Sequence, residues 1–251
     1  MSELAASALI GTSFWLATHI WCHWRYAAMR RGDLEELDSG AATERFARQL
    51  EVGVRLGTVD PDVANEAHAR GLLSDESLKS TLGGPYRRGY DRTPAAEIPW
   101  LPIYLGAALI GARISPACMV FMGVLASAAQ CDVRFRVIPT TLAVGMIPLS
   151  IVAAPIDSML VLWGRIVTAL ILLAMSALFG VLARRQGMAF GAGDAFLIAG
   201  TFTATAGFTV FAYSFVLLFE MLVRSLTGAS SNDIPLAAYL VAPVATSLLL
   251  M

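Results

Sequence analysis

The chain has 251 residues, of which 57% are hydrophobic and only 15% are charged, and its formal net charge at neutral pH is -1. A soluble domain of this size needs more polar residues to cover its surface, so the composition excludes an ordinary cytosolic enzyme and indicates a membrane protein. The small net charge argues against a nucleic-acid-binding protein, and three cysteines without a C-x-x-C pair exclude a disulfide framework and a zinc ribbon.

The charged residues are concentrated in one segment, and this concentration divides the chain. Residues 24–97 hold eleven Lys or Arg and thirteen Asp or Glu, whereas residues 98–251 hold seven and five. We expect a first transmembrane helix over 1–23, a cytoplasmic soluble block over 24–97 and a membrane-embedded domain over 98–251. The first helix lacks a basic n-region, so it is expected to be an anchor rather than a removed signal peptide.

Apolar stretches long enough to cross about 30 Å of hydrocarbon predict the membrane helices. The candidate stretches are residues 5–23, 98–113, 115–131, 137–155, 159–183, 194–223 and 235–251. The sixth would reach about 45 Å as one helix, so we predict a break at Gly207, which gives eight spans. The expected fold class is therefore all-α, a polytopic membrane protein with about eight transmembrane helices and a small cytoplasmic helical block.

Within the charged block, apolar residues at helical spacings predict short helices. One is expected over 33–53, and a second is expected to start at Asp60-Pro61-Asp62, which is typical of a capped helix start. The apolar positions of the first are Leu34, Leu37, Phe46, Leu50 and Val54.

Basic residues indicate the orientation in the membrane. The basic residues gather in three connections between spans, all on the same side of the predicted membrane. These connections are the block 24–97, the one with Arg134 and Arg136, and the one with Arg184 and Arg185. We assign this side to the cytoplasm, which leaves both chain ends outside.

Acidic residues are rare in the apolar part of the chain, and two of them face the same side. Asp132 ends the third span and Asp194 opens the sixth, with one outward and one returning helix between them. Two carboxyl groups brought within reach do not readily both ionise, so one can act as an acid while the other activates water, as peptide hydrolysis requires. Alternatively, each is an interfacial carboxylate solvated at a helix end.

The surroundings of the two acids form motifs. Asp194 lies in Gly191–Asp194 (GAGD), whose glycines permit close approach of an extended substrate, and Asp132 opens Asp132–Pro139 (DVRFRVIP). Together the motifs resemble those of the GxGD membrane aspartyl proteases, specifically the type IV prepilin peptidases, whose first motif reads approximately D-x-R-x-R-x-[LI]-P. Residues 234–240 resemble the proline-containing start of the last helix of that family, and the three matches span roughly residues 130–251.

The resemblance implies that Asp132 and Asp194 are the catalytic pair of an aspartic-type endopeptidase that needs no cofactor and no metal. The implied substrate is the basic leader of a prepilin or pseudopilin precursor. The precursor would be cleaved at the cytoplasmic face of the bacterial inner membrane, with the lipid bilayer as the other partner and no nucleic acid. The residues that we expect to set the geometry of the substrate loop are Gly191, Gly193, Arg134, Arg136 and Pro139.

The chain also departs from the family pattern. Thr140 replaces the usual Asp or Asn after the proline, and Phe196 replaces a Lys; these departures bear on substrate preference or rate and not on the acid pair. Many members carry two C-x-x-C pairs in the first cytoplasmic loop and methylate the new N-terminus. Residues 24–97 contain no cysteine, so methyltransferase activity is not expected, and the block is expected to serve docking or to be a diverged remnant.

Other interpretations stay open. Signal peptide peptidases share G-x-G-D but usually have a Tyr where Cys131 stands. A transporter or proton-relay protein could use the two aspartates in turn. A catalytically inactive pilus-assembly factor would account for Phe196. The helical neighbours His19, Cys22 and His23 lie in an aromatic stretch typical of a membrane interface, so a metal site is not expected there.

Overall fold

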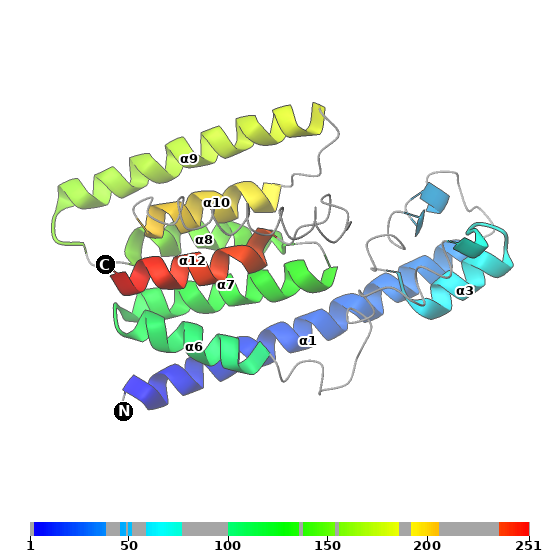
Figure 1. The fold of residues 1–251 in the computed structure, drawn as a ribbon, viewed down its shortest axis with the longest axis horizontal. Coiled ribbons are helices and arrows are strands. Elements are labelled where there is room, and N and C mark those ends of the chain that lie inside the picture. The colour runs from blue at the N-terminus through cyan, green and yellow to red at the C-terminus, as the bar shows by residue number, and fades with distance from the viewer. Residues whose placement is uncertain are drawn as a thin grey trace, which may run out of the picture. The chain divides into compact units, whose positions relative to one another are not determined.

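The computed structural model describes residues 3–38, 46–48, 50–51, 59–76, 100–135, 138–153, 156–185, 192–205 and 236–250. Among these residues the regular elements are helices and no strand occurs, which confirms the predicted all-α fold class (Figure 1). The helices are α1 (Glu3–Asp38), α3 (Pro61–Ala69), α6 (Leu101–Ala112), α7 (Pro116–Phe135), α8 (Thr140–Ala153), α9 (Met159–Arg185), α10 (Ala192–Ala204) and α12 (Leu236–Leu250).

The predicted apolar stretches correspond closely to the helices. The stretches between residues 98 and 183 match α6 to α9, and the short part of the sixth matches α10, while the predicted break at Gly207 lies outside the described residues. Helices α1, α7 and the first 20 residues of α9 are long and apolar enough to cross a membrane, and α6, α8 and α12 are apolar but shorter. These helices suggest a membrane protein, although fewer than eight crossing helices are evident in the part of the chain that the structure describes.

The chain divides into two compact units. The first holds Met1–Leu16, Trp100–Val133 and Val137–Met251, and the second holds Ala17–Pro99 with Arg134–Arg136.

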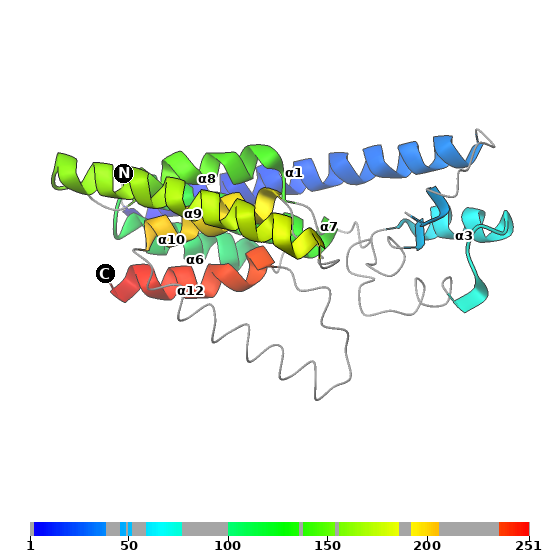
Figure 2. The ribbon, with the colours of Figure 1, turned by 90° about the horizontal axis from the view of Figure 1, so that it is seen from above.

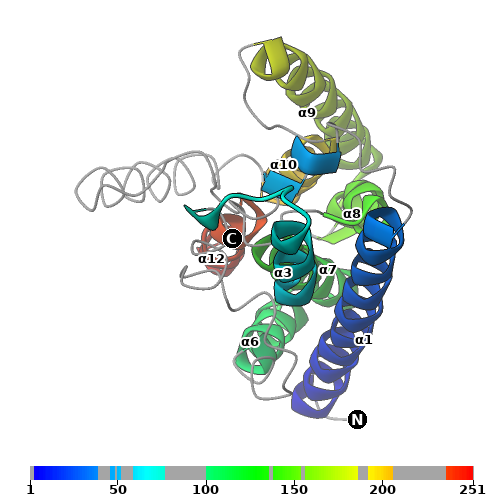
Figure 3. The ribbon, with the colours of Figure 1, turned by 90° about the vertical axis from the view of Figure 1, so that its right-hand side faces the viewer.

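Helix α7 is the centre of the first unit. Each residue from Phe121 to Asp132 is buried, and the view in Figure 3 shows α7 between α6, α8 and α12. Helices α8 and α10 approach closely at Met146 of α8 and Gly200 of α10. A Cβ on Gly200 would lie only 2.9 Å from the Cβ of Met146, so the absence of a side chain there permits the close approach. The largest fully buried apolar side chains of this core are Tyr104, Phe121, Met122, Leu125, Met146, Leu197, Leu240 and Val244.

In the second unit one predicted helix boundary is wrong. Helix α1 continues without a break to Asp38, so no separate helix begins at Asp33. Charged residues do not by themselves end a helix. Gly32 lowers the stability of the helix by about 1 kcal/mol relative to alanine, and neighbouring turns can offset that loss. The apolar pattern itself is confirmed for the described residues, because Leu37, Phe46 and Leu50 are buried together and Leu34 packs against them.

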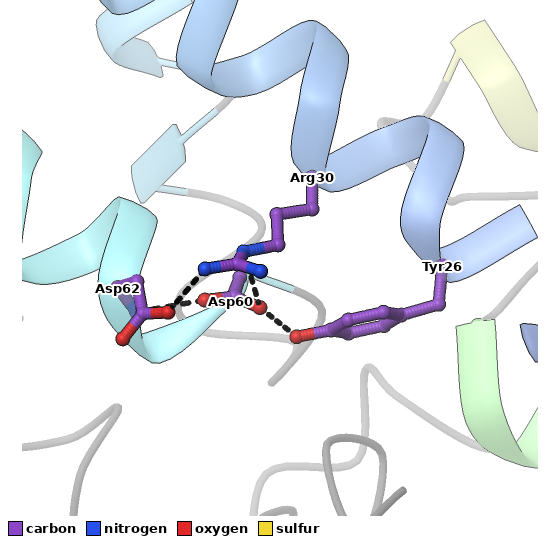
Figure 4. Close-up of polar contacts among 4 residues, drawn as sticks. All are labelled: Tyr26, Arg30, Asp60 and Asp62. Atoms are coloured by element: carbon purple, nitrogen blue, oxygen red, sulfur yellow. Dashed lines mark hydrogen bonds and ion pairs between the residues drawn. The ribbon is translucent and has the colours of Figure 1, made fainter.

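The predicted capped start of α3 is confirmed. Asp60 is the N-cap, and its Oδ1 accepts a hydrogen bond of 2.8 Å from the backbone N–H of Asp62. The Asp60 Oδ2 accepts a hydrogen bond from the hydroxyl of Tyr26, and Arg30 Nη2 lies 2.5 Å from the carboxylate of Asp62 (Figure 4). These contacts attach α3 to α1. The helix ends before Gly71, whose φ of 73° is a left-handed conformation that favours glycine.

Candidate functional site

The two motif aspartates belong to helix ends at the same end of the first unit. Helix α7 ends three residues after Asp132, and α10 begins two residues before Asp194. Figures 1 and 2 show the end of α7 at the same end of this unit as the starts of α8, α10 and α12. Two antiparallel helices, α8 and α9, connect them, so the chain leaves this end once and returns to it once.

Asp132 is a buried carboxylate, with 7% of the residue exposed. Its Oδ2 accepts a hydrogen bond of 2.9 Å from the backbone N–H of Ala237, the second residue of α12. The first N–H groups of a helix have no partner within the helix, and the partial positive charge there favours a carboxylate. This bond therefore connects the first motif to the start of the last helix, 105 residues later in the chain.

The first motif also lies against the second. Gly193 is the second residue of α10, and a Cβ there would lie 3.1 Å from the Cβ and 3.5 Å from the carbonyl oxygen of Ile138. Ile138 is partly buried against the core of the unit, in the connection between α7 and α8. The segment that follows Asp132 therefore packs against the residue that precedes Asp194.

Asp194 lies in the first turn of α10 and is partly buried. The N-terminus of α10 favours a negative charge at this position, by the same physics that favours Asp132 beside α12. The next residue, Ala195, is buried against Leu173 and Ile198 and fixes this turn to α9 and the rest of α10. Asp132 is thus bonded to the start of one helix, and Asp194 lies in the first turn of another.

The remaining predicted site residues have separate places. Arg134 is half-buried in the last turn of α7 and belongs to the second unit. Pro139 directly precedes α8, and its carbonyl oxygen accepts the N–H of Ala143 at 3.0 Å. Gly191 and Arg136 lie outside the described residues.

Phe135 is a feature of the site region that the sequence analysis missed. It is buried and makes an edge-to-face contact with Trp21 of α1, with ring centroids 6.1 Å apart and an interplanar angle of 84°. Both residues belong to the second unit, whereas Asp132, three residues earlier, belongs to the first. An aromatic residue between two arginines was the available signal, and its partner could not be read from the local sequence.

A buried polar network was also missed. The hydroxyl of Tyr104 on α6 donates a hydrogen bond of 2.8 Å to Oε1 of Gln130 on α7 and lies 3.4 Å from Oγ of Ser127. Ser127 in turn donates to the carbonyl oxygen of Gly123 at 2.9 Å. These side chains are almost completely buried, and polar groups in such a place require partners. A single Tyr and a single Gln in apolar stretches were the signal.

In the described parts of the chain, no three His, Cys, Asp or Glu side chains are grouped in a way that could hold a metal ion. This includes His19, Cys22 and His23, of which Cys22 is buried and His23 is exposed.

The chain matches no protein-family model, no curated protein and no solved structure. Any assignment of function therefore depends on the residues themselves and on their geometry.

Proposed function

We propose that this chain is a multi-pass membrane aspartyl endopeptidase of the prepilin peptidase type, with Asp132 and Asp194 as its catalytic pair. One carboxyl group would hold a proton while the other accepts a proton from the water that attacks the peptide carbonyl. The proposed substrate is a type IV prepilin-like precursor, whose basic leader is removed at the cytoplasmic face of the bacterial inner membrane. The proposed topology has eight membrane helices and both chain ends outside.

The observation that carries the proposal is the convergence of the three segments that resemble the family motifs. Asp132 of the first motif bonds to Ala237 of the third, and Ile138 of the first packs against Gly193 of the second. These segments are far apart in the sequence. The number of intervening helices accounts for a shared end of the unit, and the two contacts go further because they bring the three segments against one another there.

The burial of Asp132 supports a specialised role. A carboxylate simply solvated at a helix end would be exposed to water, whereas Asp132 is 7% exposed and bonded to a backbone N–H. The competing role is a structural cap for α12. Asparagine keeps an oxygen that can accept this N–H but cannot exchange a proton as a carboxyl group does, so Asp132→Asn separates the two roles.

The test uses the purified full-length chain in proteoliposomes with a precursor that carries a basic leader. The expected result is cleavage by the wild type, identified by sequencing the new N-terminus, and a loss of about 10²- to 10⁴-fold in rate for Asp132→Asn and Asp194→Asn. Asp157→Asn is the matched control, because Asp157 is exposed and lies between α8 and α9. Substantial cleavage by either of the first two variants would contradict the proposal.

The same proteoliposomes distinguish the rival functions. A proton-relay protein would show no cleavage but a proton flux, measured with an enclosed pH-sensitive dye, that both Asn variants abolish. An inactive assembly factor would show neither activity. In both cases the endopeptidase proposal would be rejected.

A further inference from the structure

We infer that the backbone N–H of Ala237 is a positioning group for Asp132, so that helix α12 determines how this carboxyl group is oriented. The catalytic part of this inference rests on the proposed function. Its structural part, in which a side chain of α7 caps α12, does not.

The bond has the form of a helix N-cap made between two distant segments. Helix α12 starts at Leu236, and the N–H of its second residue, Ala237, points to Oδ2 of Asp132 at 2.9 Å. An N-cap side chain ordinarily accepts a hydrogen bond from the second or third residue of its own helix. Here the residue before the helix in sequence is Pro235, whose side chain has no acceptor, and Asp132 provides the acceptor instead.

Both partners of the bond are buried, which makes the bond costly to break. Ala237 is 0% exposed and Asp132 is 7% exposed. A buried N–H without an acceptor would lose its interaction with water and gain nothing in return. The orientation of the carboxyl group is therefore coupled to the position of this N–H.

The bond also makes the two oxygens of Asp132 inequivalent. The lone pair of Oδ2 that faces Ala237 is occupied by the N–H and cannot carry a proton. The carbonyl oxygen of a neutral carboxyl group is the better acceptor, so the N–H favours a protonated Asp132 with its proton on Oδ1.

The position of the N–H is in turn fixed by the packing of α12. Ala237, Leu240, Val244 and Leu248 recur at helical spacing, and each is at most 2% exposed in the core of the first unit. A rotation or shift of α12 would move this row of side chains out of the core. The helix therefore acts as a fixed support for the Ala237 N–H.

The first experiment removes this N–H alone. Proline lacks an N–H and is accepted in the first turn of a helix, so Ala237→Pro deletes the donor while the helix can still start. Ala238→Pro is the matched control, because it deletes the neighbouring first-turn N–H, which no described contact connects to Asp132. The kcat and KM of precursor cleavage are compared for the wild type and both variants.

For Ala237→Pro we expect kcat to fall by about tenfold or more, as for the loss of one hydrogen bond to a charged group, with little change in KM. Ala238→Pro should keep the wild-type kcat and KM. If Ala237→Pro has the same kcat and KM as Ala238→Pro, the positioning role is overturned.

The second experiment needs no peptidase activity and so remains decisive if the proposed function fails. Thermal unfolding of the full chain in detergent is measured for Asp132→Ala and Asp132→Asn, each alone and combined with Ala237→Pro. Asp132→Ala should lower Tm by about 2–4 °C, as for the loss of one helix cap in a chain of this size, whereas Asn keeps an acceptor and should not. In the Ala237→Pro background, Asp132→Ala should cause no further decrease in Tm, because the donor of the bond is already missing. Equal Tm values for the Ala and Asn variants, or an undiminished effect in that background, would overturn the capping role.

Discussion

Gly193 and Ile138 lie so close together that a Cβ on Gly193 would be 3.1 Å from the Cβ of Ile138. This contact brings the segment after Asp132 against the start of the helix that carries Asp194. It also means that position 193 has almost no room for a side chain.

The first prediction follows from this contact. Gly193→Val should abolish precursor cleavage, because its branched side chain would push Ile138 and the start of α10 apart. Gly193→Ala should be milder, since Ile138 needs to move by only a few tenths of an ångström, and Ile138→Ala should partly restore the Val variant. Gly145→Val is the control, because a Cβ on Gly145 meets nothing within 4 Å. Equal cleavage by the two Val variants would contradict this prediction.

The second prediction concerns the attachment of α3 to α1. Asp60 is 4% exposed, caps α3 and accepts a hydrogen bond from the hydroxyl of Tyr26, so Asp60→Ala removes a cap and takes this acceptor from the half-buried Tyr26. We expect a loss of about 2–4 kcal/mol in the local stability of α3, measured by hydrogen–deuterium exchange of residues 61–69.

Two milder variants test whether the cap or the ion pair matters more. Tyr26→Phe should cost less than Asp60→Ala because the cap remains. Asp62→Ala should cost least, because Asp62 is 66% exposed and an exposed ion pair with Arg30 contributes little. The reverse order of protection would show that the ion pair, rather than the cap, holds α3.

The third prediction is a pH dependence of the second unit. Burial, together with the nearby Glu36, raises the pKa of Asp33, which lies ten residues beyond the predicted first span. A carboxyl group with a raised folded-state pKa contributes its full stability below its unfolded value of 3.8 and loses that contribution as the pH rises through the folded value. At neutral pH the ionised Asp33 therefore destabilises the folded unit.

Asp33→Asn should accordingly stabilise the second unit at pH 7, and this gain should disappear toward pH 4. Hydrogen exchange of α3 at the two pH values, after correction for the intrinsic exchange rates, measures the difference. Glu35→Gln is the control, because Glu35 is an exposed acid on the same helix. A gain of equal size at both pH values would exclude ionisation as the cause.

Much of the fold could be predicted from the sequence because its signals are local. The helices from α6 to α9 are separated by residues that interrupt an apolar stretch, such as Arg113, Pro139 and Asp157. The cap of α3 was predictable for the same reason, since Asp60-Pro61 acts on its immediate neighbours. The length of α1 was not, because the charged stretch that follows residue 24 carries no signal that ends a helix.

The candidate site was predictable only in part. The two aspartates and their shared side follow from rare charges and from the number of intervening helices. Their partners do not, because the donor to Asp132 is a backbone N–H that any residue at position 237 except proline would have. The contact of Phe135 with Trp21 likewise joins segments whose local patterns say nothing about each other.

The fourth prediction tests the proposed orientation of the chain. Ser158 and Ser74 are exposed, so cysteine can be introduced at either position. In intact cells an impermeant thiol reagent should label Ser158→Cys but not Ser74→Cys. The native Cys22, Cys118 and Cys131 can remain, because all three are buried and should not react. The opposite labelling pattern would invert the proposed topology.

The bond between Tyr104 and Gln130 has a consequence for biosynthesis. Helix α6 has 12 residues, which span about 18 Å, so by itself it is too short to remain stably in about 30 Å of hydrocarbon. Gln130 on α7 would be equally unfavourable in lipid without an acceptor or donor nearby. Packed together, the two helices pair the hydroxyl of Tyr104 with the amide oxygen of Gln130. If the chain is inserted into a bilayer, we therefore expect α6 and α7 to leave the insertion machinery together, as a helical hairpin. Tyr104→Phe should then delay the integration of both helices during synthesis, even where the finished protein tolerates the change.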